Sequence, residues 1–247
     1  MAGHSKWANI QHRKGRQDKI RGKLFTRIGK EITIAARDGG ILEFNPKLRM
    51  TIEKAKAANM TKDVIERAIK KGTGELEGLE YLEFTYEGYG AGGVAFVVEI
   101  VTDNKNRSAS SVRSNFARND GNLGADGAVA WMFHKKGLII VEKADMDSDD
   151  FMMQALEAGA EDVKEEDGNF HVITEFTDFM NVKTNLEAQG IKIESAESTM
   201  IPENNVEITD EETAKKVLKL YEALEDNEDV QNIYANFDIS DEIMEKI

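Results

Sequence analysis

Apolar side chains recur at helical spacing between residues 16 and 37, and Gly39 and Gly40 follow this stretch. The period predicts one long helix. Asn45 and Pro46 favour the start of a second helix, because asparagine caps well and proline presets φ at the first helical position. A third helix is expected between Thr61 and Gly72. Residues 1–75 are therefore predicted to form a small helical bundle preceded by a basic arm.

The apolar period changes to two after the glycine-containing segment 72–78. Leu82, Phe84 and Tyr86 alternate with polar residues, and residues 94–101 form a nearly continuous apolar run. Both patterns indicate β-strands. A helix capped at Ser108 and a strand over residues 129–133 are expected next.

Residues 137–200 follow the order strand, helix, strand, strand, helix, strand, which is the order of a ferredoxin-like unit. Beyond Pro202 we expect a strand at Val206, a helix opened by a capping box from Thr209 to Glu212, and a strand over 230–237. The last strand is expected to complete the sheet that begins at Leu82. The predicted fold class is α+β with three domains: 1–75, 79–136 plus 203–247, and the insertion 137–202.

Positive and negative side chains are unevenly distributed along the chain, which the net charge of −14 does not show. Residues 1–75 hold 18 Lys and Arg against 8 Asp and Glu, which gives +10. Residues 76–247 hold 14 against 38, which gives −24. This asymmetry favours a basic contact surface for polyanions on an acidic body, although two unrelated solvated surfaces would show the same imbalance.

Helical spacing gathers part of this positive charge on one side of the first helix. At about 100° per residue, the basic side chains fall in a sector of roughly 80° away from the apolar stripe. We predict nucleic-acid contacts from this ridge, the preceding arm, and the end of the third helix. The predicted residues are Lys6, Arg13, Lys14, Arg16, Lys19, Arg21, Lys23, Arg27, Lys30, Lys70 and Lys71.

Little in the chain indicates catalysis. Cysteine is absent, and the four histidines lack paired ligand spacing, so we expect no metal, no cofactor and no enzymatic activity. The glycines from Gly88 to Gly93 precede a strand rather than a helix, which favours a hairpin turn over a phosphate-binding loop. No signal peptide or apolar span is evident, so a cytoplasmic protein with no membrane contact is expected.

The turn from Thr102 to Ser108 is rich in hydrogen-bonding side chains and has two interpretations. Its polar residues can satisfy the turn and cap the next helix, which is the favoured interpretation. Alternatively, Asn104, Arg107 and Arg113 form a secondary anion or partner site. Trp131 and Phe133, spaced by two, are expected in the core rather than as a base-stacking platform.

Several short motifs together resemble the YebC/PmpR family. They are Met1–Asn9, Arg21–Lys23, Asn59–Met60, Glu66–Gly72, Tyr86–Gly90, Thr102–Asn104, Gly121–Gly124 and Lys135–Gly137. Ala91, Thr61 and Gly15 depart from the usual family residues. The resemblance implies a three-domain α+β fold with no known enzymatic activity. Family members are commonly described as probable DNA-binding transcriptional regulators, while some relatives act in translation.

Three functions are consistent with these observations. The first is a nucleic-acid-binding regulator, most conventionally of transcription through DNA. The second is a translation factor that binds ribosomal RNA, and hence the ribosome, through the same basic surface. The third is a protein-interaction module that acts through the acidic body. The sequence does not specify an oligomeric state.

Overall fold

A computed structural model of the chain describes residues 17–166 and 168–247. Within these residues, the N-terminal domain contains the helices α2 (Gln17–Ala35), α3 (Pro46–Ala57) and α4 (Lys62–Gly72), with a 3-10 turn η1 (Ala36–Asp38) after α2. Asn45 caps α3 by accepting a hydrogen bond from the Leu48 amide, at 2.9 Å. Ile28, Ile32 and Leu48 are fully buried in the core that the helices share.

The body is built around a four-stranded sheet with the order β3-β1-β2-β9. Its strands are β1 (Leu82–Tyr89), β2 (Ala95–Thr102), β3 (Asn122–Leu123) and β9 (Val230–Ala235). β1 and β2 pair antiparallel across the glycine turn, which contains the short 3-10 segment η2 (Ala91–Gly93). The predicted hairpin is thereby confirmed. Gly92 and Gly93 take positive φ values of 69° and 79°, which glycine adopts without strain.

Two helices, α5 (Lys105–Arg118) and α8 (Glu211–Glu225), pack on one side of this sheet and form one hydrophobic core with it. Asn104, rather than the predicted Ser108, caps α5, and Asp210, rather than Thr209, caps α8. Two short parallel strands, β8 (Val206–Ile208) and β10 (Phe237–Ile239), precede the terminal helix α9 (Asp241–Met244). The predicted pairing of the late strand with the first sheet is confirmed by β9, which lies antiparallel to β2.

The inserted domain has the strand order β5-β6-β4-β7, as in a ferredoxin-like fold. Its elements are β4 (Phe133–Glu142), α6 (Ser148–Glu157), β5 (Asp162–Glu166), β6 (Asn169–Glu175), α7 (Phe179–Ala188) and β7 (Ile193–Pro202). Residues 130–132 form a 3-10 turn, η3 (Ala130–Met132), so the strand predicted over 129–133 is wrong. Trp131 is consequently 63% exposed, whereas Phe133 is buried as expected.

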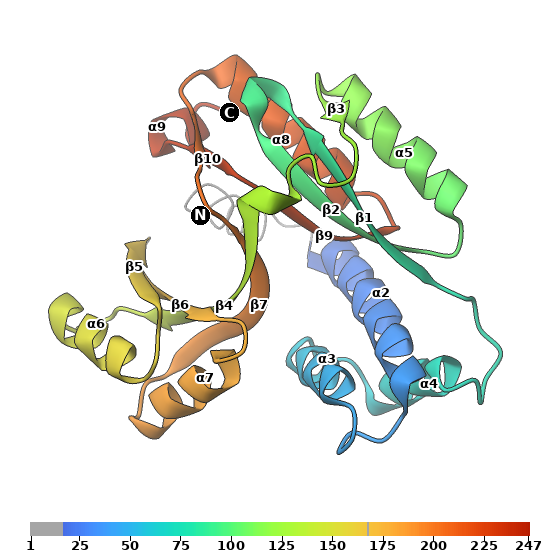
Figure 1. Cartoon of the computed structure of the whole chain (residues 1–247), viewed down its shortest axis with the longest axis horizontal. Coiled ribbons are helices and arrows are strands. Elements are labelled where there is room, and N and C mark those ends of the chain that lie inside the picture. Colours follow the sequence, from blue (N-terminus) through green and yellow to red (C-terminus); the bar gives the residue numbers. More distant parts are fainter. Residues whose placement is uncertain (1–16, 167) are drawn as a thin grey trace.

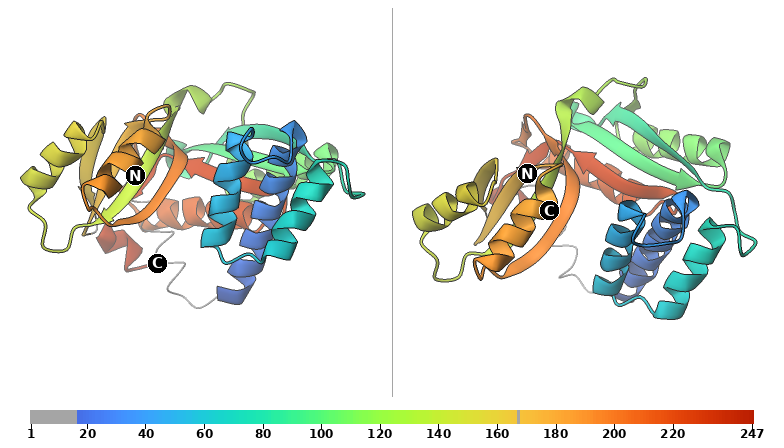
Figure 2. Two further views of the ribbon diagram at one scale, coloured as in Figure 1. Left: turned by 90° about the horizontal axis from the view of Figure 1, so that it is seen from below. Right: turned by 60° about the horizontal axis from the view of Figure 1, so that its bottom comes forward.

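The three domains are separate lobes in the ribbon diagrams, with the N-terminal helices and the inserted domain both joined to the body (Figures 1 and 2). The α+β fold class and the three-domain layout are confirmed. The boundaries at residues 75, 136 and 202 stay predictions.

Candidate nucleic-acid interface

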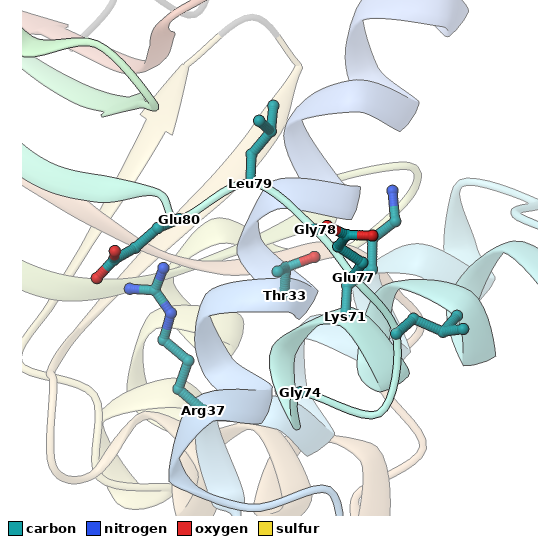
Figure 3. Close-up of a pocket in the computed structure, with 9 residues that line it drawn as sticks. Thr33, Arg37, Lys71, Gly74, Glu77, Gly78, Leu79 and Glu80 are labelled. Atoms are coloured by element: carbon teal, nitrogen blue, oxygen red, sulfur yellow. The ribbon is translucent and has the colours of Figure 1, made fainter.

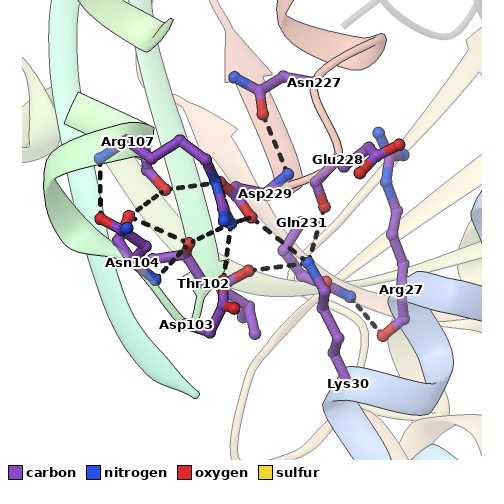
Figure 4. A network of polar contacts seen from close by, with 12 residues as sticks. Arg27, Lys30, Thr102, Asp103, Asn104, Arg107, Asn227, Glu228, Asp229 and Gln231 are labelled. Atoms are coloured by element: carbon purple, nitrogen blue, oxygen red, sulfur yellow. Dashed lines mark hydrogen bonds and ion pairs between the residues drawn. The ribbon is translucent and has the colours of Figure 1, made fainter. Parts of the chain in front are cut away.

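The cationic side of α2 faces the body of the same chain. Lys23 forms an ion pair with Asp226, and the Arg27 guanidinium donates a hydrogen bond to the Glu225 carbonyl at 2.8 Å. The Lys30 ammonium donates to the carbonyl oxygens of Glu228 and Val101, at 2.7 and 3.0 Å (Figure 4). These acceptors lie at the end of α8, in the connection between α8 and β9, and at the end of β2.

The local chemistry of the connection explains this attraction. The last carbonyl groups of a helix lack partners within the helix and carry partial negative charge, which favours nearby cations. Arg27 binds one such carbonyl at the end of α8, and Asp226 adds a full negative charge next to it. Gln231 extends the contact by donating to the Arg27 carbonyl and to the Glu31 carboxylate, at 3.1 and 2.6 Å.

Asp229 is the centre of the polar network and is 6% exposed. Its carboxylate accepts hydrogen bonds from Arg107 at 2.8 Å and from Ser108 at 2.7 Å, and lies 3.7 Å from the Lys30 ammonium. Burial raises the pKa of Asp229, but the hydrogen bonds from Arg107, Ser108 and Thr102 outweigh it, so the pKa is lowered overall. The side chain therefore stays ionised at neutral pH.

This network corrects the placement of the ridge. Lys23, Arg27 and Lys30 do share one side of α2, but this side does not project freely into solvent: Lys30 is nearly buried, and Lys23 and Arg27 are partly covered by their partners in the body. The physical reason is that the carboxylates and carbonyls of residues 225–229 attract the same cations that a polyanion would. The Lys30 side chain is only 11% exposed, and burial is the main cause of its lowered pKa.

The other predicted residues of this region lie partly outside the description. Lys6, Arg13, Lys14 and Arg16 precede residue 17. Lys19 and Arg21 belong to α2 by their backbone, and their side chains lie outside the described residues.

The secondary anion site is not assembled as one group. Asn104 caps α5 by accepting from the Arg107 amide, and the Arg107 guanidinium is held by Asp229 and by Asp103 at 2.7 Å. The favoured interpretation, in which these side chains bind groups of the turn and cap the helix, accounts for both Asn104 and Arg107. Arg113 is exposed on α5 and forms no ion pair with the part of the chain that the structure describes.

The end of α4 is the part of the predicted interface that is open. Lys70 and Lys71 are both exposed in its last turn. Arg67, three and four residues earlier, is also exposed and lies on the same side of the helix. The sequence interpretation missed Arg67, although the same 100° spacing that was applied to α2 identifies it.

Lys71 also borders a cavity of about 320 Å³ between α2, the end of α4 and the linker to β1. Arg37 lines this cavity with its guanidinium directed toward Glu80, and Glu77 lies beside Lys71 (Figure 3). Two cations and two carboxylates line the cavity, so it adds no net positive charge. The exposed side of α4, rather than this cavity, is the stronger candidate for phosphate contacts.

The fold and this surface define a class: a three-domain α+β protein with a basic helical N-terminal domain attached to an acidic body. The chain belongs to the TACO1/YebC family. Residues 5–75 match the model of the TACO1/YebC protein N-terminal domain, and residues 81–237 match that of the TACO1/YebC second and third domain.

Similar proteins cover the chain from end to end. It is 65% identical over 248 residues to a probable transcriptional regulatory protein of Fusobacterium nucleatum, covering 100% of each chain. A probable transcriptional regulatory protein of Halothermothrix orenii is 57% identical, over 100% of this chain and 99% of the relative. The crystal structure of a conserved hypothetical protein from Aquifex aeolicus is similar with a TM-score of 0.80 and 48% identity, covering 91% of this chain and 93% of that one.

The names of the Fusobacterium nucleatum and Halothermothrix orenii relatives describe them as probable regulatory proteins. Within the described residues, no helix is both long enough and apolar enough to cross a lipid bilayer.

Proposed function

We propose that this protein is a non-enzymatic, cytoplasmic regulator of gene expression that binds nucleic acid through its N-terminal domain. The observation that carries the proposal is the segregation of charge, +10 on residues 1–75 against −24 on the remainder. The exposed cations at the end of α4 support this proposal, and the names of the relatives favour transcription and hence DNA.

A second candidate is a ribosome-associated translation factor that binds ribosomal RNA with the same surface. The composition of α4 supports it, because its exposed side chains are charged apart from Val64 and include no Asn or Gln, the side chains that read adenine edges. A surface of this kind suits contacts with phosphates and with the shape of a folded RNA. A protein-interaction role of the acidic body is a third candidate.

Charge reversal on α4 tests the binding surface. The triple variant Arg67→Glu, Lys70→Glu, Lys71→Glu is expected to weaken binding to a 30-base-pair DNA duplex and to a ribosomal RNA fragment. The log–log salt slope should fall by roughly 2 to 3, because each phosphate contact that is lost removes about 0.9 from it. Fluorescence anisotropy between 50 and 200 mM KCl measures both quantities.

The matched control changes the body by the same charge. Lys164, Lys192 and Lys219 are exposed and lie outside the N-terminal domain, and their triple replacement by Glu should leave most of the binding intact. Equal loss in both variants would mean that net charge alone governs binding, which would contradict an interface on α4.

Sedimentation separates the two nucleic-acid targets. A lysate is run through a sucrose gradient at low and high salt, with and without ribonuclease. Migration with ribosomes that high salt abolishes supports the translation factor, whereas a defined footprint on a promoter fragment at physiological salt supports the transcriptional regulator.

A further inference from the structure

A network of polar contacts joins the N-terminal domain to the body. The buried cluster of the N-terminal helices and that of the body are separate, and no hydrophobic cluster of the described residues contains members of both. Lys23, Arg27 and Lys30 contact residues 225–229, Lys30 also contacts the Val101 carbonyl, and Gln231 bonds to α2. An exposed ion pair between Lys47 and Glu83 adds a further contact between the two domains.

The linker between the two domains leaves room for movement. Residues 73–80 are all exposed and lie outside any helix or strand, and Gly74 has a φ of 81°. A glycine-containing linker without regular structure constrains the orientation of its domains weakly. The orientation observed here therefore depends largely on the polar contacts.

The groups on the body side of this contact resemble a polyanion in their chemistry. The three cations are surrounded by the carbonyl oxygens of Glu225 and Glu228 and by the carboxylates of Asp226 and Asp229. Phosphate oxygens are acceptors of the same kind and also carry negative charge. One set of cations cannot satisfy both partners at once.

We propose that residues 225–231 act as an intramolecular competitor, which covers the cations of α2 and holds the N-terminal domain closed until salt or a polyanion displaces it. The closure itself is independent of the proposed function, whereas the competition with nucleic acid rests on it. The charged surface available to nucleic acid is then larger in the open form than in the closed form.

Distance measurements test the closure without any nucleic acid. The chain contains no cysteine, so spin labels can be attached only at the introduced cysteines of the variant Lys56→Cys, Lys219→Cys. Both positions are exposed, one on α3 and one on α8. Double electron–electron resonance should give one narrow distance distribution at 50 mM KCl and an added, broader and longer one at 1 M KCl, because salt screens the contacts.

A charge reversal on the body side opens the contact and leaves the cations of α2 intact. Asp226→Lys should produce the longer distances at 50 mM KCl. Its matched control, Glu157→Lys, makes the same change in net charge at an exposed position on α6 and should stay closed. If the unmodified chain is open about one-tenth of the time, Asp226→Lys should bind the DNA duplex more tightly than Glu157→Lys, by at most about tenfold because the closed form still offers α4.

Each outcome decides one part of the proposal. A single narrow distance that persists at 1 M KCl and in Asp226→Lys overturns the closure, whether or not the protein binds nucleic acid. Opening in Asp226→Lys without tighter duplex binding than in Glu157→Lys overturns the competition. Salt-dependent opening in a chain that binds neither DNA nor RNA supports the closure and contradicts the proposed function instead.

Discussion

The carboxylate of Glu87 binds three backbone amides of one segment. Its side chain, 8% exposed, accepts hydrogen bonds from the amides of Gly127, Val129 and Ala130, each at 2.7 Å. These amides belong to the segment that leads from the body into the inserted domain. Burial raises the pKa of Glu87, but the three backbone hydrogen bonds outweigh it and lower the pKa overall.

Glu87→Gln should lower the free energy of unfolding of the body by about 2 kcal/mol at pH 7, because a glutamine side chain is neutral and has one acceptor oxygen where both oxygens of Glu87 accept. The folded pKa is depressed, so the stabilisation is present above the unfolded pKa and is lost as pH falls through the folded pKa. The difference in free energy of unfolding between the unmodified chain and Glu87→Gln should therefore become smaller when urea unfolding is repeated from pH 7 down to pH 3. The exposed Glu142→Gln serves as the control, and a gap independent of pH would contradict this role of the charge.

The packing of helix α4 on α2 depends on a glycine. A Cβ atom at Gly72 would overlap the Thr33 carbonyl oxygen and lie 2.6 Å from the Ala36 Cβ. The two helices therefore approach closely where α4 ends. The exposed turn that carries Lys70 and Lys71 is positioned by this contact.

Gly72→Ala should destabilise the N-terminal domain by about 1–3 kcal/mol, because the helices must separate to admit the methyl group. Gly29→Ala is the matched substitution within α2, where nothing lies within 4 Å of the added atom. It should stabilise the helix by about 0.5–1 kcal/mol. Hydrogen exchange of the amides in α2 and α4 measures both effects domain by domain, and equal protection in the two variants would show that the close approach is not required.

Asp229 connects parts of the whole molecule that lie far apart in sequence. It binds Arg107 and Ser108 on α5 and lies near Lys30 of the N-terminal domain. Removing its charge leaves the buried Ser108 hydroxyl and the Arg107 guanidinium with a weaker acceptor.

Asp229→Asn should lower the free energy of unfolding of the body by about 1–3 kcal/mol. Because the folded pKa of Asp229 is lowered, the stabilisation is present above its unfolded pKa and disappears as pH falls through the folded value. Asp238→Asn on β10 is the control, since Asp238 forms no ion pair within the described residues. Urea unfolding followed by hydrogen exchange in α5 is the measurement, and unchanged protection of α5 would contradict the role of Asp229.

Local sequence patterns predicted most of the fold. The three N-terminal helices, the hairpin at Gly88–Gly93 and the ferredoxin-like order of elements follow from apolar period, caps and glycines. Patterns of this kind depend on neighbours along the chain. Three local predictions were wrong: the caps at Ser108 and Thr209 and the strand at Trp131. At each place several adjacent residues had similar propensities, and only packing selected the conformation that forms.

The sequence by itself determined that positive charge gathers in the first 75 residues and on one side of α2, because helical geometry fixes which side chains share a side. Only the tertiary structure decided what that side meets. The acceptor of Arg27 lies 198 residues away at the end of α8, and no local period encodes that distance. Long-range electrostatic contact therefore decides which cations remain open, and it leaves the end of α4 exposed while covering α2.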